Sequence, residues 1–180
     1  MIIAEQKRRE NIAEYLIYMF QVEDIIRASG LDISVIEKNV IERFSVPYAV
    51  KRDMREWYLS LIAMMKDEGK TRGGHLNLLT GLADELNTLH LRLLNDAETF
   101  EYKALYARAR TSLEALRVKS QKGSHDVLLM LEGLYGLLML RLQKMEISPE
   151  TEKAFSSIAS LMAWLSAAYL SLERGEQDIV

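Results

Sequence analysis

Val127-Leu-Leu-Met-Leu-Glu-Gly-Leu-Tyr-Gly-Leu-Leu-Met-Leu-Arg-Leu142 is the stretch that decides the fold class. It is apolar on every side of a helix rather than along one stripe, which is typical of a helix buried on most sides. Glu132 and Arg141 interrupt it before it reaches the length of about 20 apolar residues that a membrane span needs. We therefore expect 127–142 to be a nearly all-apolar central helix of a bundle, where Gly133 and Gly136 let a neighbouring helix approach closely.

The rest of the chain shows the same helical spacing, with few interruptions. Apolar residues recur at positions i, i+3, i+4 and i+7, and no segment alternates as a strand would. We expect about seven helices, the first over 4–29 and the fifth over 97–120, with Asp32 as an N-cap. Pro47 and Pro149 are expected in the first turns of two others, where proline is tolerated. Because the connections are short, the sequence predicts an all-α, up-and-down bundle.

The composition narrows the class of protein further. The chain has 180 residues, 49% of them hydrophobic, no cysteine and a formal net charge of −3. This length predicts one domain over residues 1–180, and the missing cysteine excludes disulfides and thiolate metal ligands. The small negative charge gives no field that would hold nucleic acid. The first ten residues lack the apolar core of a secretory signal, so we expect a cytoplasmic protein with no membrane segment.

The last predicted helix contains no charged residue over positions 154–172. Serine and alanine dilute it too much for a convincing membrane span. Ala159, Ala163 and Ala167 recur four residues apart on one face, which suits close packing of two helices. We predict that this face, together with Trp164, meets the same helix of a second copy in a homodimer, the commonest homo-oligomer. The alternative is a second interior helix within one chain.

Two loops have similar sequences, Arg72-Gly-Gly-His75 and Lys122-Gly-Ser-His125, and each leads into a helix. In an up-and-down order these two helices run parallel, so that both loops lie at the same end of the bundle. Helix N-termini favour an anion, and the sequence therefore predicts a site for a small anionic ligand. Its residues would be Lys70, Arg72, His75, Lys122 and His125. The alternative is two ordinary glycine loops with solvated charges and capping histidines.

Other polar residues receive simpler interpretations. Glu23 and Arg27 are four apart, so we expect an exposed ion pair worth a few tenths of a kcal/mol, although Glu23 borders an apolar stripe and could point inward. His90, among leucines, is expected at the edge of the core. No Glu-x-x-His or His-Glu-x-x-His motif occurs, and we expect no metal and no cofactor. The sequence singles out no catalytic residue.

We expect a non-catalytic protein that acts by binding a small anion or a partner protein, and two alternatives stay open. A metal-independent enzyme would use His75, His125 or His90. A DNA-binding regulator would use 26–31 as the turn of a helix-turn-helix. Nucleic acid is nevertheless the less favoured partner, because acidic residues in the following helix repel phosphate.

Several strings resemble a known family. They are Lys7-Arg-Arg-Glu-Asn-Ile-Ala-Glu-Tyr-Leu-Ile-Tyr-Met-Phe-Gln-Val-Glu-Asp-Ile-Ile-Arg27, Gly74-His-Leu76, Leu89-His-Leu-Arg-Leu-Leu94 and Leu140-Arg-Leu-Gln-Lys-Met-Glu-Ile-Ser-Pro-Glu-Thr-Glu152. They are similar to an all-helical bacterial family catalogued as a domain of unknown function. The resemblance implies one full-length helical domain, and it brings no activity, cofactor or catalytic residue with it.

Overall fold

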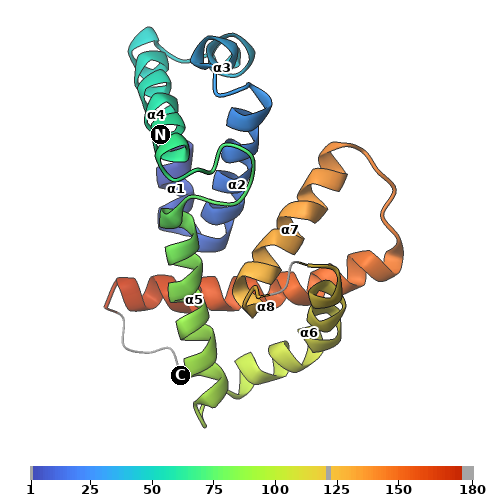
Figure 1. Ribbon diagram of the computed structural model, residues 1–180. Helices are drawn as coiled ribbons and strands as arrows, with labels where there is room; N and C mark the ends of the chain where they lie inside the picture. Colours follow the sequence, from blue (N-terminus) through green and yellow to red (C-terminus); the bar gives the residue numbers. More distant parts are fainter. Residues whose placement is uncertain (1, 121–122, 176–180) are drawn as a thin grey trace.

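The computed structural model describes residues 2–120 and 123–175, and their regular structure is entirely helical (Figure 1). The helices are α1 (Ile2–Glu10), α2 (Ile12–Ala28), α3 (Ile33–Asn39), η1 (Ile41–Arg43), α4 (Tyr48–Asp67), α5 (Asn77–Asn95), α6 (Phe100–Lys119), α7 (Asp126–Leu142) and α8 (Pro149–Glu173). The prediction of an all-α protein is confirmed, with eight α-helices in the described residues instead of seven.

Local sequence signals place several helix starts correctly. The Asp32 side chain accepts a hydrogen bond from the Ser34 N–H and caps α3. Pro47 directly precedes α4, and Pro149 stands in the first turn of α8 behind the N-cap Ser148. These signals act within one turn of helix, so they do not depend on the tertiary fold.

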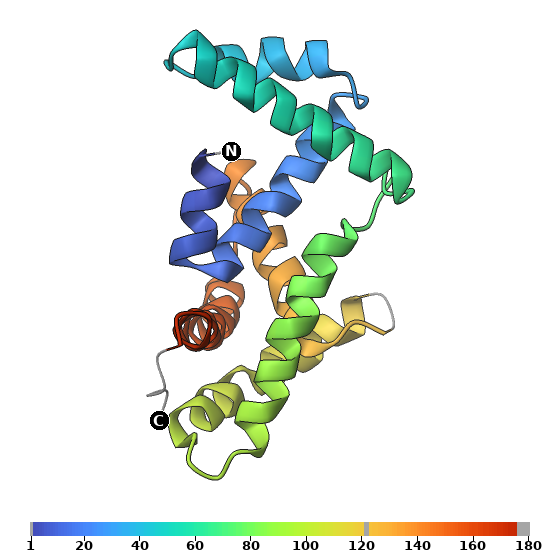
Figure 2. The same ribbon diagram turned by 90° about the vertical axis from the view of Figure 1, so that its left-hand side faces the viewer.

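The single helix expected over 4–29 is wrong, because the chain breaks at Asn11. The Asn11 backbone is extended, with φ at −158°, and its side chain accepts hydrogen bonds from the N–H groups of Ala13 and Glu14. Asparagine competes for backbone hydrogen bonds in this way and therefore favours helix starts over helix interiors. As a result the chain reverses direction and α1 lies beside α2 in a V (Figure 2).

Two helices share the centre of the molecule. α8 runs across it and packs against α2, α5, α6 and α7 (Figure 1). α7 packs against α2, α5, α6 and α8. Most of its buried residues lie in its first half, from Val127 to Leu131. Leu140 and Leu142, at its far end, are exposed. The prediction that 127–142 is buried on most sides is therefore wrong for the last turn of the helix, although Leu137 before it is still buried.

The two glycines of α7 differ in their surroundings. A Cβ atom on Gly133 would lie 2.9 Å from Leu116 Cδ1 and 3.2 Å from Phe155 Cε1, so that α6 and α8 approach α7 closely here. A Cβ atom on Gly136 would meet no atom within 4 Å. The prediction that a neighbouring helix approaches α7 closely is thus correct at Gly133 and wrong at Gly136.

The helices form a bundle but do not alternate strictly up and down. α5 and α7 run in opposite directions, as both views show (Figures 1 and 2). His125, just before α7, contacts Asp84 in the interior of α5, whereas Tyr135, further along α7, packs on Phe20, which stacks on His75 ahead of α5. The expected parallel arrangement of these two helices is wrong, because α6 packs along α8 instead of returning between them.

The segment from α3 to α4 forms an arm at one end of the molecule, at the top of Figure 2. α4 contacts α2, α3 and η1, and the connection from α4 to α5 leads back to the bundle. We call residues 68–76, which make this connection, the strap.

Candidate functional site

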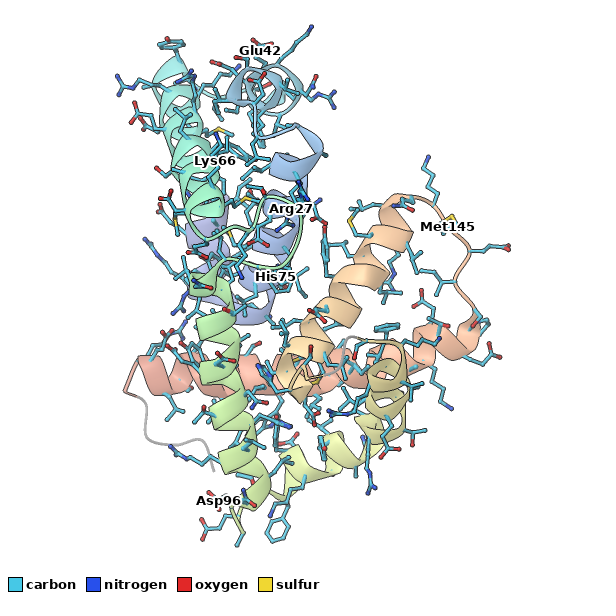
Figure 3. All side chains as sticks on the ribbon, in the orientation of Figure 1. Arg27, Glu42, Lys66, His75, Asp96 and Met145 are labelled. Carbon is cyan, nitrogen blue, oxygen red and sulfur yellow. The ribbon has the colours of Figure 1, made fainter. Side chains whose placement is uncertain are left out.

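A buried carboxylate, that of Glu23, joins α2 to the strap. His75 of the strap and Arg27 of α2 lie near each other at this junction (Figure 3). The Glu23 side chain is fully buried, and its Oε2 lies 2.6 Å from His75 Nδ1. Its Oε1 accepts a hydrogen bond of 2.8 Å from the Leu76 N–H. A buried carboxylate needs such partners, because transfer from water without them is costly. The His75 ring stacks on Phe20 with 3.6 Å between ring centroids, so both the position and the plane of the imidazole are fixed.

Arg27 binds the strap one turn further along α2. Its Nε donates to the Lys70 carbonyl at 3.2 Å, and its Nη2 donates to the Gly74 carbonyl. Nη1 pairs with Asp24 at 2.7 Å. Gly74 has a φ of +75°, which favours glycine. The expectation of an exposed Glu23–Arg27 pair is therefore wrong: the two charged groups stand 3.9 Å apart and hold the strap.

Tyr135 connects α7 to the same cluster. Its hydroxyl donates to Asp24 Oδ2 at 2.6 Å, and its ring meets Phe20 edge-on. Burial raises the pKa of Tyr135, and the bond to the Asp24 carboxylate raises it further, so the phenol keeps its proton. We name Glu23, Asp24, Arg27, His75 and Tyr135 the strap cluster.

The contact with Glu23 orients the imidazole ring of His75. In a neutral ring, a carboxylate acceptor favours the proton on Nδ1 and leaves Nε2 as an acceptor. A general base is built in this way, but it also needs a cavity for a substrate. The hollows beside α1, α5 and α6 are lined by other side chains, and His75 and His125 line none of them. In the structure, His75 fastens the strap to α2 through its contact with Glu23.

A second buried cluster joins α5, α6 and the start of α7. His90 is fully buried; its Nδ1 bonds to the Tyr102 hydroxyl, and its Nε2 lies 3.6 Å from Asp126 Oδ2. Asp126 also accepts from the Tyr106 hydroxyl at 3.1 Å and pairs with Arg117. The pKa of Asp126 is lowered to about 2, and the largest cause is the His90 ring. Tyr106 and Arg117 also lower this pKa, whereas partial burial raises it. The cluster keeps a charged aspartate at the helix start.

The sequence missed the Asp126 cluster almost entirely. His90 was expected at the core edge, and it is fully buried. Tyr102 and Tyr106, four residues apart, put two hydroxyl groups on the same side of α6, and this spacing is the signal that could have indicated polar partners for His90.

The residues predicted to hold an anion lie apart. His75 binds Glu23, whereas His125 caps α7 by accepting from the Leu128 N–H at 3.2 Å and bonds to Asp84 at 3.0 Å. The prediction that both loops lie at one end of the bundle is wrong, because α5 and α7 run antiparallel.

The backbone at the start of α5 also leaves little room for an added anion. The Leu76 N–H is bonded to Glu23, and the Asn77 N–H donates to Glu68 Oε2 at 2.6 Å. The protein's own carboxylates thus occupy these donors. Lys70 is part of the strap, Arg72 is exposed, and Lys122 lies outside the described residues.

The residues predicted for a dimer interface divide into two groups. Ala159, Ala163 and Ala167 are exposed on the outer face of α8. Trp164 is half-buried and packs on Tyr102, with 4.9 Å between ring centroids, so it faces α6 instead.

The fold and these two clusters define an all-α bundle protein whose ionisable groups fasten its helices together. In residues 2–120 and 123–175, no group of three histidine or acidic side chains is placed to hold a metal ion. The chain belongs to the family described as domain of unknown function (DUF4924), whose model matches residues 1–176. Comparison with curated proteins and with solved structures found no match. The predicted resemblance to a family of unknown function over nearly the whole chain is thereby confirmed.

Proposed function

We propose that this protein is a non-catalytic interaction protein that forms a homodimer through the outer face of α8. The observation that carries the proposal is an exposed helix face made only of small, uncharged residues. Its members are all exposed: Ser156, Ala159, Ser160, Ala163 and Ala167. We call this set the small-residue face.

Such a face is unusual for a helix in contact with water. Exposed faces of helices normally carry charged or long polar residues, yet α8 has none between Ala154 and Leu172. Small side chains let two helix backbones come close, and a twofold axis brings the same face of two chains together. A second copy of α8 therefore suits this face in both shape and polarity.

The inner face of α8 is already occupied. Leu161, Met162 and Leu165 are buried against the rest of the bundle. Among the described helices α8 alone is long and apolar enough to cross a membrane, and 44% of its most apolar window is buried inside the protein. Insertion into a lipid bilayer would require these buried contacts to separate. Association with a second chain covers the outer face and leaves the inner contacts intact.

The anionic ligand is not part of this proposal, because the donors at the start of α5 are occupied and the two histidine loops lie apart. A cytoplasmic location stays a prediction of the sequence.

The experiment is a mass measurement by light scattering after size-exclusion chromatography. At micromolar concentrations we expect twice the chain mass of 20.7 kDa. Ala163→Glu places a charge in the middle of the small-residue face and should give the monomer. Ala63→Glu, at an exposed alanine within α4, is the matched control and should remain dimeric. Circular dichroism checks that each variant is folded.

Two results would contradict the proposal. One is a monomeric wild-type protein over the whole micromolar range. The other is a dimer that tolerates Ala163→Glu and Ala159→Glu as well as it tolerates Ala63→Glu, which would place the interface elsewhere on the molecule.

A further inference from the structure

The arm and α1 enclose an apolar hollow of about 350 Å³. α1 and α4 do not pack closely along their lengths in the described residues, and α4 crosses above the first turns of α1 (Figure 2). The hollow between them is lined by the side chains of Ile3, Glu5, Phe44, Val46, Val50, Asp53 and Met54. Its volume is at the lower end of the range of small-molecule sites, which are mostly apolar with a few polar groups.

The apolar walls of this hollow are incompletely covered. Ile3, Phe44, Val46 and Val50 are half-buried, whereas Met54 is buried beneath them. A ligand that covers these apolar side chains removes their surface from water, which favours binding. None of the residues that line the hollow belongs to α8, so the site shares no side chain with the small-residue face.

Among the described residues, the charged side chains that line the hollow are both acidic, Glu5 from α1 and Asp53 from α4. Two basic side chains beside Asp53 on α4 have partners in the arm: Lys51 donates to the Glu42 carbonyl at 3.3 Å, and Arg55 pairs with Glu37 at 3.2 Å.

Asp53 pairs with its neighbour Arg52. The distance is 3.6 Å, and the two side chains are 72% and 63% exposed. An ion pair this open to water holds its partners weakly. The Asp53 carboxylate therefore stays available to a cation that arrives with an apolar body in the hollow.

We propose that the hollow between α1 and α4 binds a single-chain amphiphile with a cationic head, such as a primary alkylamine. The alkyl chain lies against Ile3, Val50 and Phe44, and the ammonium group lies at the acidic rim beside Asp53. Because the ligand touches both α1 and α4, its binding also ties the arm to the bundle.

The test uses three probes of equal chain length: decylamine and decanoate below their micelle concentrations, and decanol below its solubility limit. Titration calorimetry on the wild-type protein should rank their affinities in the order decylamine, decanol, decanoate, since these heads carry a positive, no and a negative charge at pH 7. Asp53→Asn should weaken decylamine binding by roughly 1.5- to 5-fold, the range of one exposed charged contact, and leave decanol binding unchanged. Glu56→Gln removes an exposed charge one turn along α4, outside the hollow, and is the matched control.

Hydrogen exchange locates the ligand without a variant. Decylamine should slow amide exchange in residues 2–10 and 41–54 and leave α8 unchanged. The proposal is overturned if none of the three probes binds, as would happen if the hollow served only an apolar side chain of another protein. It is also overturned if decanoate binds as tightly as decylamine, or if Asp53→Asn and Glu56→Gln have the same effect.

Discussion

Glu23 is the residue on which the strap depends most. Its position beside the apolar stripe of α2 allowed an inward orientation to be foreseen from the sequence. Its partners, His75 and the Leu76 N–H, follow more than fifty residues later. Those partners were not predictable, because their placement depends on how the strap crosses α2, and no local signal encodes that path.

Replacing Glu23 by glutamine tests the strength of this contact. The amide keeps the size of the side chain but loses the charge that holds His75, and its NH2 group needs a new acceptor in a buried place. We expect Glu23→Gln to lower the free energy of unfolding by about 1–3 kcal/mol, measured by urea denaturation at pH 7. Glu56→Gln, on an exposed surface, should change it by less than about 0.5 kcal/mol. Equal effects of the two variants would show that Glu23 does not stabilise the strap.

Asp126 gives the protein a defined sensitivity to acid. Its pKa is lowered from 3.8 to about 2 in the folded state, chiefly by His90. A group with a lowered folded pKa contributes stability above its unfolded pKa and loses it as the pH falls towards the folded value. The contribution is about 1–2 kcal/mol after allowance for partial solvent exposure. The stability difference between wild type and Asp126→Asn should therefore be constant from pH 7 to 5 and shrink between pH 4 and 2. A difference independent of pH would contradict this assignment.

At the scale of helices, apolar patterning predicted burial better in some elements than in others. It identified 154–172 as uncharged and α7 as apolar, yet the last turn of α7 is exposed. Periodicity reports which residues avoid water within one helix, whereas burial also depends on how far the neighbouring helices extend. The last turn of α7 runs beyond its partners, as its exposed Leu140 and Leu142 show. The break at Asn11 was missed for a related reason: the apolar spacing continues through it while the cap interrupts the backbone.

Gly133 and Gly136 form a matched pair for testing the packing of α7. Alanine is favoured over glycine inside a helix by about 1 kcal/mol, and a Cβ atom at Gly136 meets nothing within 4 Å. Gly136→Ala should therefore raise the free energy of unfolding by about 0.5–1 kcal/mol. Gly133→Ala brings Cβ to 2.9 Å from Leu116 Cδ1, and the cost of moving that side chain should leave this variant about 1 kcal/mol less stable than Gly136→Ala. Thermal and urea unfolding of both variants measure the difference, and equal stabilities would show that α6 yields at this contact without cost.

For the molecule as a whole, the sequence predicted an all-helical bundle but not the relative directions of its helices. Short connections make sequential helices neighbours, yet they do not decide on which side of the bundle each one packs. The arm illustrates this, since α3, η1 and α4 leave the bundle and return through the strap instead of adding another antiparallel layer. The predicted anion site required α5 and α7 to run parallel. Because they run antiparallel, the two loops that would have formed the site lie apart.

Arg27 is the second α2 side chain, besides Glu23, that attaches the arm to the bundle through the strap. Arg27 donates to two strap carbonyls and pairs with Asp24, a forked geometry that lysine does not reproduce although it keeps the charge. We expect Arg27→Lys to speed amide exchange roughly 10-fold in residues 69–76, the effect of losing one charged hydrogen bond, with a smaller increase in α4 and none in α8. Arg110→Lys, in an exposed pair with Glu114 on α6, is the control and should leave the strap unchanged. If exchange instead rises equally in the strap, α4 and α8, then Arg27 stabilises the whole bundle, and the arm does not move as a separate unit.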